Sequence, residues 1–199
     1  MKLDIILSGV GGQGILSIAA VIGEAALAEG LSIKQAEVHG MSQRGGDVQS
    51  NLRISSRPIA SDLIARGSAD AIISLEPMEA LRYLPYLSKE GWIVTNTAAF
   101  VNIPNYPEHG DLLESLRRID NVIMLDVDAI AKDNAAPRAA NIVLLGAAAP
   151  VLGLEYDKLE GGVRRIFARK GDEIVGMNLK ALAAGRAAAE AILKEKRNG

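Results

Sequence analysis

Cysteine is absent from this chain of 199 residues, and histidine is almost absent. Iron–sulfur clusters are held by cysteine thiolates and disulfides join two cysteines, so this chain can supply neither feature. The two histidines, His39 and His109, have no acidic residue at the spacing that a helical zinc site requires. The sequence therefore predicts no metal site. Any redox centre that the protein serves must belong to another molecule.

Aromatic residues, strong net charge and long hydrophobic runs are also lacking. Phenylalanine, tyrosine and tryptophan together make up 4% of the chain, so the core must be mainly aliphatic. The net charge is −2 and no stretch is strongly basic, which predicts no nucleic-acid partner. No apolar run approaches the roughly 18 residues that cross a bilayer, and Asp4 interrupts the apolar start. This start indicates a buried strand rather than a signal peptide, and we expect a cytoplasmic protein with no membrane contact.

Apolar residues follow strand and helix periods in turn along the chain, and 49% of all residues are hydrophobic. This length and composition predict a single domain over residues 1–199. Strands that alternate with helices predict an α/β fold: a Rossmann-like three-layer sandwich whose mostly parallel sheet has helices on both faces. The predicted strands are 3–8, 32–38, 47–55, 70–75, 91–97 and 121–127; the predicted helices are 14–29, 77–87, 111–119, 128–135, 138–154, 156–169 and 172–195.

A glycine-rich loop follows the first predicted strand, in the stretch "LSGVGGQGILS" (7–17). Gly9, Gly11 and Gly14 fit the pattern G-x-G-x-x-G between a strand and a helix, which is the context of a dinucleotide-binding motif. Glu37, near the end of the second strand, could read a ribose hydroxyl there. One interpretation is therefore a stand-alone NAD(P)-binding reductase. Another is that the glycines only form the turn from strand to helix, in a structural docking module.

A second loop, "HGMSQRGG" (39–46), stands where a dinucleotide-binding domain usually begins its next helix. It places Ser42, Gln43 and Arg44 at the carboxyl end of the second strand, the edge where open α/β sheets bind ligands. A guanidinium near a helix start suits a phosphate or a carboxylate. The alternative is that Arg44 pairs with the neighbouring Asp47.

The pairing of "GVGGQG" (9–14) with "VHGMSQRGGDVQSNLRIS" (38–55) is more specific than either motif alone. Together they resemble the gamma subunit or domain of the 2-oxoacid:ferredoxin oxidoreductases, and particularly the small subunit of indolepyruvate ferredoxin oxidoreductases. The resemblance continues through "ADAIISLEPMEALR" (69–82) and "AANIVLLGA" (139–147), so it covers most of the chain.

The resemblance implies a reaction in which a 2-oxoacid and coenzyme A give an acyl-CoA, carbon dioxide and reduced ferredoxin. Thiamine diphosphate and iron–sulfur clusters do this chemistry in the family. This chain has neither cysteine nor the G-D-G opening of a thiamine diphosphate motif, so we expect those cofactors on a larger partner subunit and no catalytic residue here. Ferredoxin would be reached through the complex, and a homodimer is the alternative for the isolated chain.

The resemblance also suggests what the two loops bind. The expected ligand is coenzyme A, or the loops lie at the entrance to the partner's thiamine site. The cofactor-binding residues implied in this way are Gly11, Gly12, Gln13, Gly14, Ser42, Gln43 and Arg44.

Two further patterns lead to expectations about packing. In residues 47–55 polar and apolar residues alternate, which predicts a half-exposed strand. Its polar residues, Gln49, Asn51 and Arg53, would line a cleft or an interface, or face solvent. In the alanine-rich stretch 182–193, Ala184, Ala188 and Ala191 recur at helical spacing. We expect that stripe to pack tightly against the sheet or a second subunit.

Overall fold

In the computed structural model, which describes residues 1–40 and 45–198, the strands form one six-stranded sheet in the order β2-β3-β1-β4-β5-β6. The strands are β1 (Lys2–Val10), β2 (Ser32–His39), β3 (Asp47–Ser55), β4 (Ala69–Ser74), β5 (Leu87–Asn96) and β6 (Val122–Leu125). The helices are α1 (Ile15–Ala28), α2 (Pro77–Arg82), α3 (His109–Arg117), α4 (Val127–Asp133), α5 (Ala140–Leu152), α6 (Tyr156–Phe167) and α7 (Asp172–Asn198).

The sheet is mostly parallel, as predicted. β1, β4, β5 and β6 pair in parallel with one another, whereas β3 runs antiparallel to both of its neighbours, β1 and β2. A short connection can join antiparallel strands, while parallel strands need a longer crossover. The short link after β2 therefore returns the chain as β3, which lies between β2 and β1.

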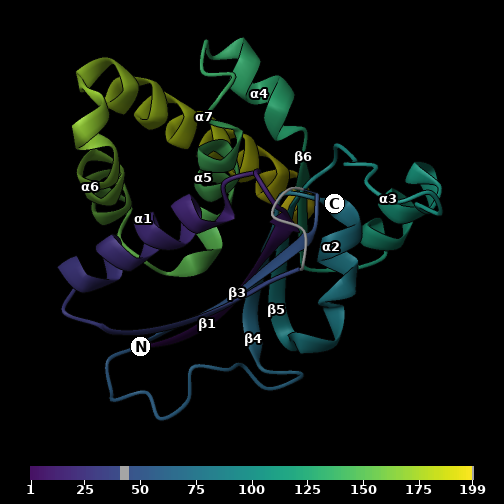
Figure 1. Cartoon of the computed structure of the whole chain (residues 1–199), viewed down its shortest axis with the longest axis horizontal. Coiled ribbons are helices and arrows are strands. Elements are labelled where there is room, and N and C mark those ends of the chain that lie inside the picture. Colours follow the sequence, from purple (N-terminus) through teal and green to yellow (C-terminus); the bar gives the residue numbers. More distant parts are fainter. Residues whose placement is uncertain (41–44, 199) are drawn as a thin grey trace.

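The helices cover the two faces of the sheet (Figure 1). α1, α5, α6 and α7 lie on one side and α2 and α3 on the other. Side chains of β1 alternate between the two cores: Ile5 and Leu7 enter the first, and Ile6 enters the second. This period of two is what a strand buried on both faces requires. The α/β prediction is confirmed.

α5 and α7 touch through their backbones. A Cβ atom added to Gly146 would lie 2.0 Å from the carbonyl oxygen of Leu182, and one added to Gly185 would lie 1.9 Å from that of Val143. Close helix packing on α7 was expected and is found, but the predicted stripe was wrong. The buried positions are Ala181, Gly185 and Ala189, whereas Ala184 and Ala188 are half-buried and Ala191 is exposed. The two helices approach most closely at Gly146 and Gly185, because glycine is smaller than alanine. The position of Gly185 therefore determines which face of α7 is buried against α5.

The polar face of β3 is partly covered by another segment of the chain. Asn51 is buried, and its side-chain oxygen accepts a hydrogen bond of 3.2 Å from the backbone N–H of Ile64. The Arg53 guanidinium donates to Asp4 and to the carbonyl oxygens of Ser61 (2.9 Å) and Leu63 (3.2 Å). The connection between β3 and β4 therefore folds back over this face. The predicted alternation in residues 47–55 is found, because Asp47, Gln49 and Arg53 are half-buried and the positions between the polar ones are buried. Asn51 departs from it, because the segment that covers it has no regular apolar pattern in the sequence.

Candidate functional site

The glycine loop joins β1 to α1 at the carboxyl edge of the sheet, and the side chain of Gln13 fastens it there. The side-chain oxygen of Gln13 accepts from the backbone N–H of Val10 at 2.7 Å, and its amide nitrogen donates to the Leu75 carbonyl oxygen at 3.2 Å. A Cβ at Gly9 would lie 2.8 Å from that side-chain oxygen. Gln13 therefore ties the loop to the ends of β1 and β4, and Gly9 leaves room for it.

Gly12 and Gly14 both have a positive φ, but their surroundings differ. Gly14 has a φ of 89°, and a Cβ there would lie 2.6 Å from the amide nitrogen of Asn141, which donates to the Gly14 carbonyl at 3.1 Å. Gly12 has a φ of 102° and nothing within 4 Å of its would-be Cβ. L-residues rarely adopt such angles, so both positions favour glycine. Only Gly12 has open space above it.

Several backbone N–H groups of the loop are already engaged. Gly11 donates to the Gly46 carbonyl oxygen at 2.8 Å, and Gln13 donates to that of Val10 at 3.1 Å. The N–H of Gly12 has no acceptor among the residues that the structure describes. Gly12 is therefore the point at which the loop can meet another molecule.

The second sequence motif lies beside the first. Ser42, Gln43 and Arg44 fall outside the described residues, but the segments on either side of them are in place. Gly40 donates its N–H to the Asp47 carbonyl at 2.9 Å, and Gly46 accepts from Gly11. The structure thus brings the flanks of the 41–44 loop to the glycine loop, at the same edge of the sheet.

A third segment, residues 97–108 between β5 and α3, lies beside the second loop and was not predicted from the sequence. The side-chain nitrogen of Asn102 donates to the Gly45 carbonyl at 2.6 Å, which holds this segment against the second loop. Phe100, Val101 and Ile103 are exposed, Val101 to 70%. Apolar side chains at three of four successive positions inside a turn-rich stretch were the signal that could have revealed it.

A buried carboxylate anchors this segment. Glu76 is fully buried and accepts from the Phe100 N–H at 3.4 Å, from the Tyr106 hydroxyl, and from the Glu79 N–H at 2.8 Å. Burial, together with the neighbouring Glu76, raises the pKa of Tyr106, so its hydroxyl remains a donor at neutral pH. Burial also raises the pKa of Glu79, although the hydrogen-bonded Arg82 offsets part of that effect. These groups are engaged with one another, so we assign them to holding the segment.

The dinucleotide interpretation, which was based on the glycine pattern, loses Glu37 as its supporting acidic residue. Glu37 pairs in register with Ser50 of β3, which in turn pairs with Leu7 of β1. Two strand spacings, about 10 Å, therefore separate Glu37 from β1, and it lies level with Leu7 rather than with the loop. Its carboxylate also accepts from the Gln35 side chain at 2.6 Å. Glu37 is not placed to read a ribose beside the glycine loop.

The described parts of the chain contain neither a cluster of metal ligands nor a helix that could span a membrane. Within residues 1–40 and 45–198, no three His, Cys, Asp or Glu side chains come together as a metal site would require. None of the helices there combines the length and the apolar character needed to cross a bilayer.

Comparison with known proteins gives consistent matches over nearly the whole chain. The family model for pyruvate ferredoxin/flavodoxin oxidoreductase matches residues 4–188. The indolepyruvate oxidoreductase subunit IorB of Archaeoglobus fulgidus is 36% identical, over 93% of this chain and 94% of its own length. The keto/oxoacid ferredoxin oxidoreductase gamma subunit of Geobacter sulfurreducens superimposes with a TM-score of 0.71, at 25% identity, over 95% of this chain and 99% of its own.

A larger solved protein shares the fold. The 2-oxoglutarate:ferredoxin oxidoreductase of Magnetococcus marinus, solved with 2-oxoglutarate, coenzyme A and succinyl-CoA bound, has a TM-score of 0.74 at 21% identity. The match covers 96% of this chain but only 31% of that one.

Proposed function

This chain belongs to the pyruvate ferredoxin/flavodoxin oxidoreductase family, and from that premise we propose that it is the small subunit of an indolepyruvate-type 2-oxoacid:ferredoxin oxidoreductase. The observation that carries the proposal is the similarity to an indolepyruvate oxidoreductase subunit over nearly the full length of both chains. The reaction proposed is the coenzyme A-dependent oxidative decarboxylation of an aryl-pyruvate, with ferredoxin as the electron acceptor.

The redox cofactors of such an enzyme fit a partner rather than this chain. Thiamine diphosphate stabilises the carbanion left by decarboxylation, and iron–sulfur clusters carry the electrons away. With no cysteine in its sequence, this chain has no thiolate to hold a cluster. A larger partner subunit therefore carries both cofactors and passes electrons to ferredoxin.

The role of this chain is to present the glycine loop to an anion at the edge of the sheet. Gln13 holds the loop in shape, Gly11 is tied to Gly46, and Gly12 offers a free N–H with open space above it. Ser42, Gln43 and Arg44 belong to the adjoining loop, where a guanidinium would complete the contact. Coenzyme A is the proposed anion, and the entrance to the partner's thiamine site is the alternative. The coenzyme A bound in the Magnetococcus marinus oxidoreductase supports the first.

The exposed apolar residues of segment 97–108 are the proposed contact with the partner subunit. Phe100, Val101 and Ile103 lie beside the loop that flanks the glycine loop, and the hydrogen bonds to Glu76 and Gly45 hold that segment in place. Contiguous exposed apolar side chains commonly mark protein interfaces. A partner docked there would bring its thiamine site to the same edge of the sheet.

Co-purification of the chain with its partner subunit, followed by assay with a panel of 2-oxoacids, tests this proposal. We expect the complex to reduce ferredoxin with coenzyme A present and to have its highest kcat/KM with indolepyruvate. The isolated chain should oxidise no 2-oxoacid and bind no iron, because it lacks the ligands. A complex that prefers pyruvate, or an isolated chain that contains iron, would contradict the assignment.

A Gly12→Ala substitution tests the loop itself in that complex. A methyl group at Gly12 would occupy the open space and displace an approaching anion, so the KM for coenzyme A should rise by roughly tenfold, with kcat less affected. Gly12 has a positive φ, so alanine also strains the backbone. Gly30→Ala is the matched control, because Gly30 has a φ of 72°, open surroundings and a position at the opposite end of α1. Equal KM values in the two variants would show that the loop is only a turn.

A further inference from the structure

A hollow of about 310 Å³ lies where α1, α5, α6 and α7 meet, near the start of α1. Ser17 of α1 and Asn141 of α5 line one part of it, and Phe167 and Met177, from α6 and α7, line another. Arg138, just before α5, and Lys170, just after α6, complete the lining with their cationic side chains. Of the residues assigned above to the coenzyme A contact, the four that the structure describes, Gly11 to Gly14, are not among those that line it.

The charge in this hollow has one sign. Arg138 and Lys170 are the ionisable residues among its lining, and neither has a carboxylate partner within the described chain. The Lys170 ammonium lies 5.3 Å from the centre of the ring of Phe167, which also lines the hollow, and this cation–π contact is attractive. The Ser17 hydroxyl has no hydrogen-bond partner among the described residues either. Two unpaired cations converge here in a protein whose net charge is −2.

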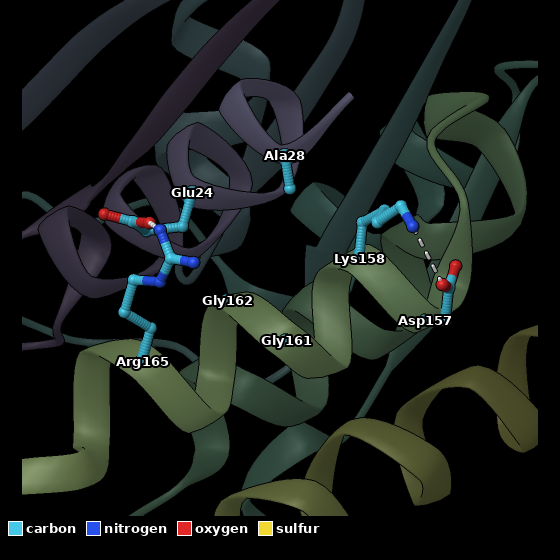
Figure 2. Close-up of a pocket in the computed structure, with 7 residues that line it drawn as sticks. All are labelled: Glu24, Ala28, Asp157, Lys158, Gly161, Gly162 and Arg165. Atoms are coloured by element: carbon cyan, nitrogen blue, oxygen red, sulfur yellow. Dashed lines mark hydrogen bonds and ion pairs between the residues drawn. The ribbon is translucent and has the colours of Figure 1, made fainter. Parts of the chain in front are cut away.

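Two other hollows in the described structure are lined by cations that already pair with carboxylates. Figure 2 shows one of about 190 Å³ between α1 and α6, in which Arg165 bonds Glu24 at 2.9 Å and Lys158 bonds Asp157 at 3.2 Å. The hollow beside Lys2, Asp4 and Arg53 is similar, because Asp4 pairs with both cations. Groups already paired in this way offer an anion little, so these two hollows differ in kind from the first.

We propose that the hollow between Arg138 and Lys170 binds the phosphate group of a small organic molecule. A guanidinium can donate two parallel hydrogen bonds to phosphate oxygens, an ammonium adds a point charge, and the Ser17 hydroxyl can donate a further bond. The apolar side chains of Phe167, Ile174 and Met177 give the organic part of the ligand a surface to cover. This site goes beyond the proposed function, whose anion contact lies at Gly12.

The hollow also shares a wall with the glycine loop. Asn141 lines it and donates to the Gly14 carbonyl, so a ligand in the hollow would contact the residue that fixes the start of α1. Occupancy of the hollow should therefore stiffen the loop.

Calorimetric titration of the full chain with sodium pyrophosphate, inorganic phosphate and coenzyme A, at matched ionic strength, tests the site. Arg138→Gln and Lys170→Gln should each weaken binding of the phosphate ligands by about tenfold, since each removes a charge-assisted contact. Arg164→Gln and Lys180→Gln are the controls, because these residues are exposed, as Arg138 and Lys170 are, but lie on α6 and α7 outside the hollow.

The pattern across ligands identifies the source of the phosphate. Coenzyme A binding much more tightly than pyrophosphate, with both weakened by the two hollow variants, would indicate a phosphate of a larger cofactor. Equal or tighter binding of pyrophosphate would indicate a free phosphate ligand. The absence of binding to the unmodified chain, or an equal loss in the hollow variants and the controls, would overturn the proposal.

Discussion

Substitution of Gly185 by alanine should lower the free energy of unfolding by about 3 kcal/mol or more, although alanine is the better helix former. The new Cβ would lie 1.9 Å from the carbonyl oxygen of Val143, a backbone atom that no rotamer change can move away. α5 and α7 would have to separate, and the buried contacts of Ala181 and Ala189 would loosen with them. Urea unfolding followed by far-UV circular dichroism measures the loss.

Gly176→Ala is the matched control in the same helix. Nothing lies within 4 Å of a Cβ at Gly176, so alanine there should raise the free energy of unfolding by roughly 0.5–1 kcal/mol through helix propensity alone. Opposite signs for the two substitutions are the expected result. Similar small effects at both positions would show that α5 and α7 are not in backbone contact.

Arg53→Met should lower the free energy of unfolding at neutral pH by about 3 kcal/mol, because it leaves a buried carboxylate short of its main partner. Asp4 is 1% exposed and accepts two hydrogen bonds from the Arg53 guanidinium, at 2.8 and 3.1 Å. The same guanidinium holds the connection between β3 and β4 through the carbonyls of Ser61 and Leu63. Arg57→Met, at an exposed position just beyond β3, is the control and should change stability by less than about 0.5 kcal/mol.

The pH dependence of the same pair has a defined sign. Burial alone would raise the pKa of Asp4, but hydrogen bonds from Arg53 and Lys2 outweigh it, and the pKa of Asp4 is lowered. A lowered pKa contributes stability above the unfolded-state value, near 3.9, and that stability is lost as the pH falls through the folded-state pKa. Without Arg53, burial should dominate and raise the pKa. The difference between the two proteins should therefore shrink as the pH falls below about 5.

A double variant separates the cost of an unpaired buried charge from the cost of the lost hydrogen bonds to Ser61 and Leu63. Asp4→Leu combined with Arg53→Met removes both charges, and apolar replacements of buried pairs are often close to neutral. Recovery of most of the lost stability is the expected outcome. A double variant as unstable as Arg53→Met would instead assign the cost to the lost anchoring of Ser61 and Leu63.

Local patterns predicted the elements of this fold but not their neighbours. The apolar periods placed every strand of the sheet within a few residues, because burial on both faces leaves a direct mark on a strand. The period of two in residues 47–55 could not show that β3 enters between β2 and β1, since pairing is decided by distant segments. The helix predicted over 77–87 ends at Arg82 instead, because Pro85 lacks the N–H that a continuing helix needs. β5 then begins early, at Leu87.

The candidate site was predictable to the same degree. Turn chemistry located the two loops, and strand order brings their flanks together at Gly11 and Gly46. Segment 97–108 was not predicted, because its apolar residues follow neither a strand nor a helix period. Its position depends on a hydrogen bond to the buried Glu76, which is distant in the sequence. The inward position of the Gln13 side-chain amide could not be predicted from the sequence either, because its acceptor is the carbonyl of the distant residue Leu75. Hydrogen bonds between residues distant in sequence leave no local pattern.

The crossing of α5 and α7 has a mechanical consequence for the glycine loop. The backbones of α5 and α7 touch at Gly146 and Gly185, so sliding one helix along the other would bring side chains into steric clash. We therefore expect the two helices to move together as one rigid body. Asn141, in the first turn of α5, donates to the Gly14 carbonyl and so connects the glycine loop to this pair of helices. A partner that displaces α7 from its exposed side would therefore also displace the start of α1, and the glycine loop would move with it.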